Sequence, residues 1–202
     1  MKKVQIIAYG IFLIGLILKF FHFPKNTIII MIGVLLMLLV NFITAFNKKY
    51  DKLHVINGFA ITFWFILILF TVKFWPFANQ LLLITCLLTI ISIVYSYKSK
   101  KLNELKLLFI SCLLCLTFYM MPTDIRYHLI SIKWNQEIET DYYSWDKYSW
   151  FLYQNGHYDE ALKTSIHASE IAHQYANIYN EVEFIEIIAN HNKKIKNKTW
   201  NK

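Results

Sequence analysis

KFFHFP, residues 19–24, closes the first long apolar run of the sequence, and VKFWP, residues 72–76, closes the third. Proline lacks an amide hydrogen and disfavours helical geometry in the residue before it, so Pro24 and Pro76 each predict a tight turn. Residues 23–26 leave room for nothing longer than such a turn. Each stretch is therefore predicted to join the two helices of an antiparallel hairpin.

The apolar runs around these turns have the length of membrane spans. A helix needs about 20 apolar residues to cross a hydrocarbon core of about 30 Å. The first run starts after lysines, as a signal peptide does, but it lacks a small-residue cleavage site and is interpreted as a retained helix. The predicted spans are residues 4–23, 27–46, 53–72, 78–97 and 107–121. We predict an all-α fold, with a transmembrane domain at 1–122 and a small helical domain at 123–202.

The first two hairpins align with each other at an offset of 52 residues. The alignment places Pro24 on Pro76, and it places the lysine pair 48–49 on the pair 100–101. Because turns, spans and basic loops all agree, the pattern favours a duplicated hairpin over chance similarity between low-complexity helices.

Charge is divided unevenly along the chain. Residues 1–122 contain twelve lysines and two acids, a net charge of +10, whereas residues 123–202 contain nine basic and eleven acidic residues. Lysine-rich short loops stay in the cytoplasm, and here the lysines gather at the amino end and in loops 47–52 and 98–106. We predict a multi-pass protein of the bacterial cytoplasmic (inner) membrane, with its amino terminus in the cytoplasm and its carboxy-terminal domain outside.

This charge pattern also bears on partners. The lysine excess belongs to membrane loops, so membrane lipid is the expected partner of the first domain. A nucleic-acid-binding surface would place arginine and aromatic residues on a soluble face, and the chain has a single arginine, Arg126. Nucleic-acid binding is therefore not predicted.

Polar and aromatic residues cluster near the hairpin turns. The candidate functional positions there are Lys19, His22, Pro24, Lys73 and Pro76. Lys19 lies within about two helical turns of Pro24, so its side chain can reach the interface. Interfacial anchoring is the favoured interpretation, and a functional Lys19–His22 pair stays open. Four aromatic residues are predicted to form interfacial belts: Phe23, Trp64, Phe74 and Trp75.

The first hairpin resembles a known family. Gly15, Lys19, His22 and Pro24, followed by Gly33, are similar to the amino-terminal hairpin of GldL, the membrane subunit of the gliding-motility and type IX secretion motor. The resemblance covers about forty of the 202 residues and implies a hairpin that carries proton flow to drive a partner subunit. Met37 stands where the family has an intramembrane glutamate. We interpret the resemblance as shared ancestry of the hairpin and not as shared activity. A membrane subunit for ion-driven energy coupling, secretion or transport is the alternative function for the chain.

Residues 142–175 resemble a tetratricopeptide repeat, a pair of antiparallel helices. The residues that carry this resemblance, and that it implies pack the pair together, are Trp145, Tyr148, Gly156, Tyr158, Ala161 and Ala168. A lone repeat needs neighbouring helices to cover it. Such helices are predicted at residues 125–135, capped by Thr123 and Asp124, and at residues 176–194.

The same resemblance implies a binding surface. The first helix of each such pair lines a concave surface, which implies that a partner meets Lys147, Trp150, Tyr153 and Gln154. Exposed aromatic residues on one short helix are typical of interaction sites. The alternative is that Trp150 and Tyr153 pack on the helix at 125–135 or enter the headgroup layer.

Catalytic motifs are missing from the sequence. The histidines between 128 and 191 form no H-E-x-x-H pattern, and Cys112 and Cys115 have no second cysteine pair. We predict no enzyme activity, no cofactor and no metal site. The sequence instead predicts a membrane-anchored scaffold or adaptor that presents a tetratricopeptide-like domain to an unidentified protein partner, while homo-oligomerisation stays open.

Overall fold

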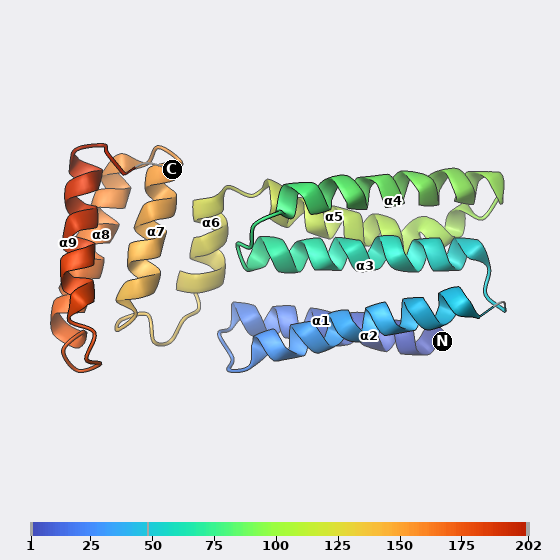
Figure 1. Ribbon diagram of the computed structural model, residues 1–202, viewed down its shortest axis with the longest axis horizontal. Coiled ribbons are helices and arrows are strands. Elements are labelled where there is room, and N and C mark those ends of the chain that lie inside the picture. Colours follow the sequence, from blue (N-terminus) through green and yellow to red (C-terminus); the bar gives the residue numbers. More distant parts are fainter. Residues whose placement is uncertain (1, 48, 201–202) are drawn as a thin grey trace. The chain divides into compact units, whose positions relative to one another are not determined.

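The computed structural model describes residues 2–47 and 49–200, and it confirms an all-α fold (Figure 1). The membrane-length helices are α1 Lys2–Phe20, α2 Asn26–Phe46, α3 Lys52–Val72, α4 Ala78–Lys98 and α5 Lys106–Met120, the last preceded by a 3₁₀ turn, Leu102–Leu105. The shorter helices are α6 Thr123–Tyr127, continued by a π-helical turn at His128–Ile132, then α7 Tyr142–Gln154, α8 Tyr158–Tyr175 and α9 Glu183–Lys196.

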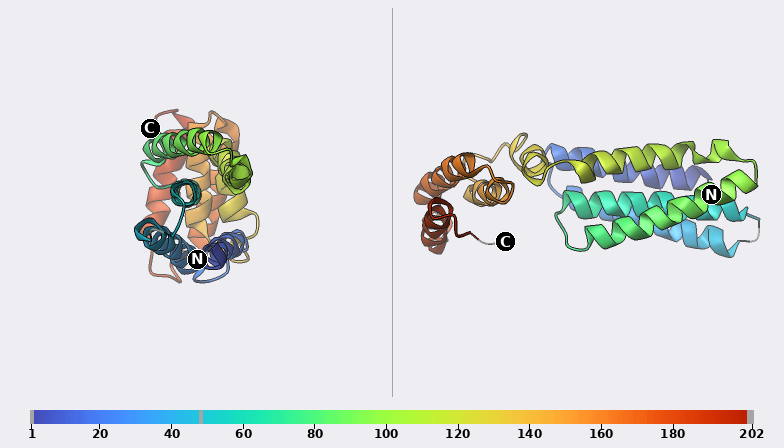
Figure 2. Two further views of the ribbon diagram at one scale, coloured as in Figure 1. Left: turned by 90° about the vertical axis from the view of Figure 1, so that its right-hand side faces the viewer. Right: turned by 90° about the horizontal axis from the view of Figure 1, so that it is seen from above.

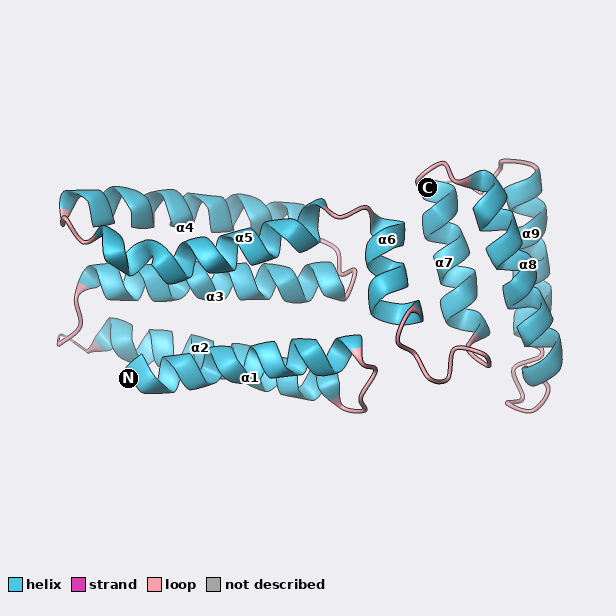
Figure 3. Cartoon of the chain, turned by 180° about the vertical axis from the view of Figure 1, so that it is seen from behind, coloured by secondary structure: helices cyan, strands magenta, loops and turns pink. Residues whose placement is uncertain are grey.

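The chain folds as two compact units, which are described separately. The bundle comprises Met1–Lys19 with Phe23–Met121, and the carboxy-terminal domain comprises Phe20–His22 with Pro122–Lys202. In the bundle, five helices are long and apolar enough to cross a membrane, in agreement with the number predicted. They run side by side along one direction (Figures 2 and 3).

The first helix is shorter than predicted. The predicted span extends to residue 23, but α1 ends at Phe20. His22 adopts the left-handed conformation with φ 54°, and the amide of Phe23 donates to the carbonyl of Leu18 at 3.0 Å. This hydrogen bond and the left-handed residue end α1 four residues before Pro24.

The two tight turns have the same backbone geometry. Both place left-handed residues at equivalent positions, His22 and Lys25 in the first turn and Phe74 and Phe77 in the second. The second turn repeats the closing hydrogen bond, from the amide of Trp75 to the carbonyl of Phe70, also at 3.0 Å. The ends of α1 and α3 and both ends of α2 and α4 are also 52 residues apart. The 52-residue correspondence thus extends from sequence to backbone conformation.

Helix α3 is the core of the bundle. It lies between the pair α1 and α2 and the pair α4 and α5 (Figures 1 and 2), and it has the most buried span. The belt position predicted for Trp64 is wrong, because this side chain is 1% exposed and its Nε1 donates to Thr89 Oγ1 at 2.9 Å. Within the bundle 67% of the α3 span is buried, and Trp64 belongs to this buried part. Trp75, beside the turn, is 40% exposed.

Glycines allow α1 and α2 to approach closely. A Cβ atom at Gly33 would lie 2.8 Å from the backbone nitrogen of Phe12, and one at Gly15 would lie 2.8 Å from that of Ile30. Small residues of this kind are typical of helix contacts in membranes, where van der Waals packing replaces the hydrophobic effect.

Buried amides link three helices of the bundle. Gln5 of α1 donates to Asn41 Oδ1 of α2 at 3.1 Å, and Asn41 donates to the Gly58 carbonyl and to Thr62 Oγ1 of α3, at 3.0 and 2.7 Å. A Cβ atom at Gly58 would lie 2.5 Å from Asn41 Oδ1, so glycine makes room for this junction. Buried polar groups are expensive unless they are paired.

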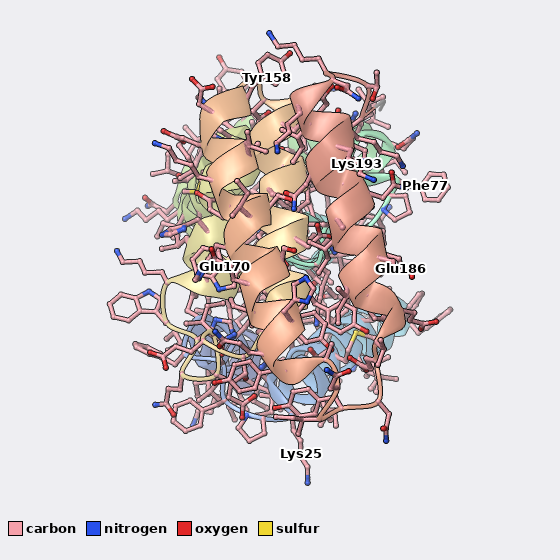
Figure 4. All side chains as sticks on the ribbon, turned by 90° about the vertical axis from the view of Figure 1, so that its left-hand side faces the viewer. Lys25, Phe77, Tyr158, Glu170, Glu186 and Lys193 are labelled. Carbon is pink, nitrogen blue, oxygen red and sulfur yellow. The ribbon has the colours of Figure 1, made fainter. Side chains whose placement is uncertain are left out.

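The carboxy-terminal domain is built on the antiparallel pair α7 and α8. Together they cover residues 142–175, the range of the predicted repeat. Asp141 caps α7 by accepting from the amide of Ser144 at 2.9 Å, and Gly156 turns the chain with φ 87°. Helix α9 then runs antiparallel to α8, as the positions of Tyr158, Glu170, Glu186 and Lys193 show in Figure 4.

Two predicted boundaries in this domain are wrong. The last helix begins at Glu183 and not at residue 176, because Asn180 adopts φ 58° and the amide of Glu181 closes α8 on the Ala176 carbonyl at 2.8 Å. Helix α6 begins at Thr123 without a side-chain cap. Asp124 is instead buried and accepts from Asn155 Nδ2 at 2.6 Å, next to the turn between α7 and α8.

Candidate functional site

One face of α7 carries a stripe of large and charged side chains. Tyr143, Asp146, Lys147 and Trp150 recur at intervals of three or four residues, so they lie above one another on one side of the helix. The opposite side is buried, where Tyr142 and Leu152 join the two apolar clusters of the domain. The fold therefore presents this stripe away from the core.

The stripe forms one wall of a hollow. The hollow has a volume of about 460 Å³, within the range of small-ligand and peptide-anchor sites. Its lining comes from α6, α7, α9 and the tail after α9: Tyr127, Tyr143, Ser144, Asp146, Lys147, Trp150, His191 and Trp200.

A histidine–aspartate pair connects two walls of the hollow. His191 Nδ1 of α9 lies 3.0 and 2.9 Å from the two carboxylate oxygens of Asp146. Both side chains are about one-fifth exposed. Because a carboxylate accepts hydrogen bonds, Nδ1 carries the proton in this pair. The ring of His191 stacks on Trp200 with centroids 4.4 Å apart, so the pair fixes both α9 and the tail against α7.

Tyr127 of α6 lines the hollow and carries no charge. Lys147 Nζ lies 5.8 Å from the ring centroid of Tyr127, within the range of a cation–π contact. Burial raises the pKa of the Tyr127 hydroxyl, so this ring stays protonated. Burial, followed by the charge of Lys133, lowers the pKa of His128, whose ring packs against Tyr148. Lys147 and Asp146 are thus the charged side chains that line the hollow.

The four residues predicted to meet a partner are divided by the structure. Lys147 and Trp150 line the hollow. Tyr153 and Gln154 contact the tail instead, since the Tyr153 ring lies 6.0 Å from that of Trp200 and Gln154 Nε2 donates to the Trp200 carbonyl at 3.4 Å. They support the wall that Trp200 provides.

The predicted packing residues lie along the α7–α8 interface and its turn. Ala161 and Ala168 are fully buried, and Tyr148 packs beside Leu152. Trp145 Nε1 donates to the Ile138 carbonyl at 3.0 Å, and its ring meets His167 edge-on. Gly156 forms the turn, while Tyr158 is 40% exposed and lies against Tyr153.

Several lining residues escaped the sequence analysis. Asp146 and Tyr143 share the helical spacing of Lys147 and Trp150, so the pattern could have found them. His191 and Trp200 are 41 or more residues away from Trp150 in the chain. Their positions in the hollow depend on how α9 packs against α7 and α8, and no local sequence pattern predicts this packing.

The hairpin-turn candidates form a separate group at the two tight turns. Lys73 of the second hairpin reaches the first hairpin, where its Nζ donates to Thr27 Oγ1 at 2.6 Å. Pro24 and Pro76 are exposed at the turns, and His22 supplies the left-handed residue of the first turn.

Within residues 2–47 and 49–200, the structure brings no three histidine, cysteine or acidic side chains together as metal ligands. The hollow offers aromatic faces, an ammonium group and a histidine–carboxylate pair, which suit the recognition of another molecule by contact. Comparison of the chain with protein-family models, curated proteins and solved structures finds no significant match.

Proposed function

We propose that this chain is a membrane-anchored scaffold or adaptor that binds a segment of a partner protein in the hollow of its tetratricopeptide-like domain. The observation that carries the proposal is the stripe on α7 that faces the hollow. Binding hot spots are enriched in tyrosine, tryptophan and arginine, and tyrosine and tryptophan gather around this concavity. The alternative packing of Trp150 against the helix that follows Pro122 is not favoured, because the Trp150 ring contacts that of Phe151 in its own helix, with centroids 5.0 Å apart, and its side chain lines the hollow.

The arrangement of the last three helices supports a repeat-like domain. Helix α8 packs against both α7 and α9, while α7 and α9 meet each other through Asp146 and His191. In helical repeats, the first helices of successive pairs lie next to each other and form the concave surface. Under this proposal, α9 is the first helix of a second, incomplete unit.

The bundle supports the role of an anchor. Helices α1 to α5 contain no Asp or Glu, and carboxylates are the usual groups of proton relays in membranes. We therefore rank the anchor above the ion-driven coupling that the resemblance to GldL implies.

Replacing Trp150 by alanine should weaken partner binding about thirtyfold, the loss of a hot-spot side chain of about 2 kcal/mol. The partner is first trapped by a photo-reactive amino acid at Tyr143, inside the hollow, and compared with the same group at the exposed Ile166 of α8. Affinity of the purified partner for the full-length protein then gives the measurement.

Trp134 provides the matched control, because it is also exposed but lies outside the lining of the hollow. Trp134→Ala should leave affinity unchanged. Equal affinities for wild type and Trp150→Ala, with unchanged protease resistance of the domain, would show that the hollow is not the binding site.

We also propose that the amino terminus lies in the cytoplasm and the carboxy-terminal domain outside it. The lysine-rich loops support this orientation. A reporter active only outside the cytoplasm should work when fused after Lys202 and fail when fused after Lys49. Cytoplasmic signals from both fusions would mean that residues 107–121 do not cross, and would reverse the assignment of the domain.

A further inference from the structure

The tight-turn end of the bundle holds two lysines from different hairpins. Lys19 lies in the last turn of α1, and Lys73 directly follows α3. Both are half-buried. Gly15, one helical turn before Lys19, packs against Ile30 of α2, so Lys19 faces the first turn of α2. Lys73 Nζ reaches that same turn, because it donates to Thr27 Oγ1 at 2.6 Å. Two ammonium groups are therefore held near each other in a partly desolvated place, where like charges repel more strongly than in water.

This repulsion has no compensating acid inside the bundle. Its two acids are Asp51 and Glu104, and Asp51 caps the opposite end of α3, where it pairs with Lys101 at 2.5 Å. A helix of 21 residues separates Asp51 from Lys73, which corresponds to about 30 Å. Glu104 lies in the turn before α5, also at the far end from the tight turns.

Hydrogen bonding leaves most of the ammonium donors at this end unused. Lys73 donates to Thr27 Oγ1, at the start of α2, where the helix dipole itself disfavours a cation. Among the residues that the structure describes, no side chain forms a hydrogen bond or ion pair with Lys19. Each ammonium group can donate three hydrogen bonds, so an anion with several oxygens would satisfy both lysines and offset their repulsion.

We propose that Lys19 and Lys73 bind the phosphate group of a membrane phospholipid between the two hairpins, in the leaflet on the side of the tight turns. The proposal rests on insertion of the bundle in a membrane, and is independent of the partner-binding hollow. Phosphate is the anion that a bilayer supplies at the ends of its spanning helices. Its oxygens accept short, charge-assisted hydrogen bonds from lysine, and the exposed apolar faces of α1 and α2 adjoin the acyl chains.

The test uses full-length protein in detergent, titrated with phosphatidylglycerol and followed by native mass spectrometry and thermal unfolding. The wild type should retain lipid and gain thermal stability. Lys19→Met and Lys73→Met should each bind it about tenfold more weakly, through loss of a charge-assisted hydrogen bond. Lys25→Met is the matched control: Lys25 is at the same turn but is exposed and extends outward (Figure 4), so lipid binding should be unchanged.

Two further probes identify the source of the anion. Diacylglycerol, which has the tails without the phosphate, should not stabilise the protein, and inorganic phosphate should do so only at far higher concentration. Equal lipid retention by the wild type, Lys19→Met and Lys73→Met would overturn the proposal, as would equal stabilisation by inorganic phosphate. Recovery of the variants in the membrane fraction separates failure of this site from failure of insertion.

Discussion

Replacing Gly33 by valine should destabilise the bundle by about 3 kcal/mol, the upper range for overpacking a close contact. A Cβ atom at Gly33 would lie 2.8 Å from the nitrogen and 2.9 Å from the Cα of Phe12. These are backbone atoms of α1, which cannot rotate away as a side-chain end can. The two helices would have to separate, and the buried hydrogen bond between Gln5 and Asn41 would lengthen with them.

Gly10→Val is the control for this substitution. Gly10 also lies within α1, but no neighbouring atom lies within 4 Å of the position of its Cβ. Valine there should change stability by less than about 0.5 kcal/mol. The free energy of unfolding is measured by denaturant titration in mixed micelles, following helix content. Similar effects of the two substitutions would show that α1 and α2 do not approach closely at Gly33.

Local features of the bundle were predictable because their signals are local. Apolar length indicated five long helices, and Pro24 and Pro76 marked both turns. The predicted end of α1 was three residues too late. The helix ends because His22 adopts the left-handed conformation, and histidine is not a residue type that predicts this conformation from sequence. In the carboxy-terminal domain the sequence did offer a signal, because Asn180 belongs to the residue types that tolerate the left-handed conformation.

The candidate site was predictable only in part, because its walls come from distant segments. Lys147 and Trp150 followed from helical spacing within α7. The pairing of Asp146 with His191 spans 45 residues and depends on the angle at which α9 packs. Burial of Asp124 by Asn155 likewise depends on a tertiary contact, so sequence reasoning assigned Asp124 to a helix cap instead.

The burial of Trp64 was likewise not predictable from the sequence. Its replacement gives the second large change in stability that we expect. Tryptophan in a membrane protein is most often expected at the interface, and composition alone does not show which span will be surrounded. Trp64→Ala should lower the free energy of unfolding by about 3 kcal/mol, at the lower end for truncation of a buried aromatic residue. With the bundle anchored in a membrane, as proposed above, the lower end applies. Lipid is itself apolar, so the lost contribution is packing and not transfer from water.

Two variants separate the possible causes of this loss. Trp64→Phe retains a ring but removes the hydrogen bond to Thr89 Oγ1, so it should cost about 1 kcal/mol. Trp75→Ala removes a tryptophan that is 40% exposed beside the second turn, and should cost less than Trp64→Ala when measured in the same micelles. If Trp64→Ala and Trp75→Ala destabilised the bundle equally, Trp64 would not be a core residue and α3 would not be the surrounded helix. A cost confined to Trp64→Ala would instead show that α3 organises the packing of both hairpins.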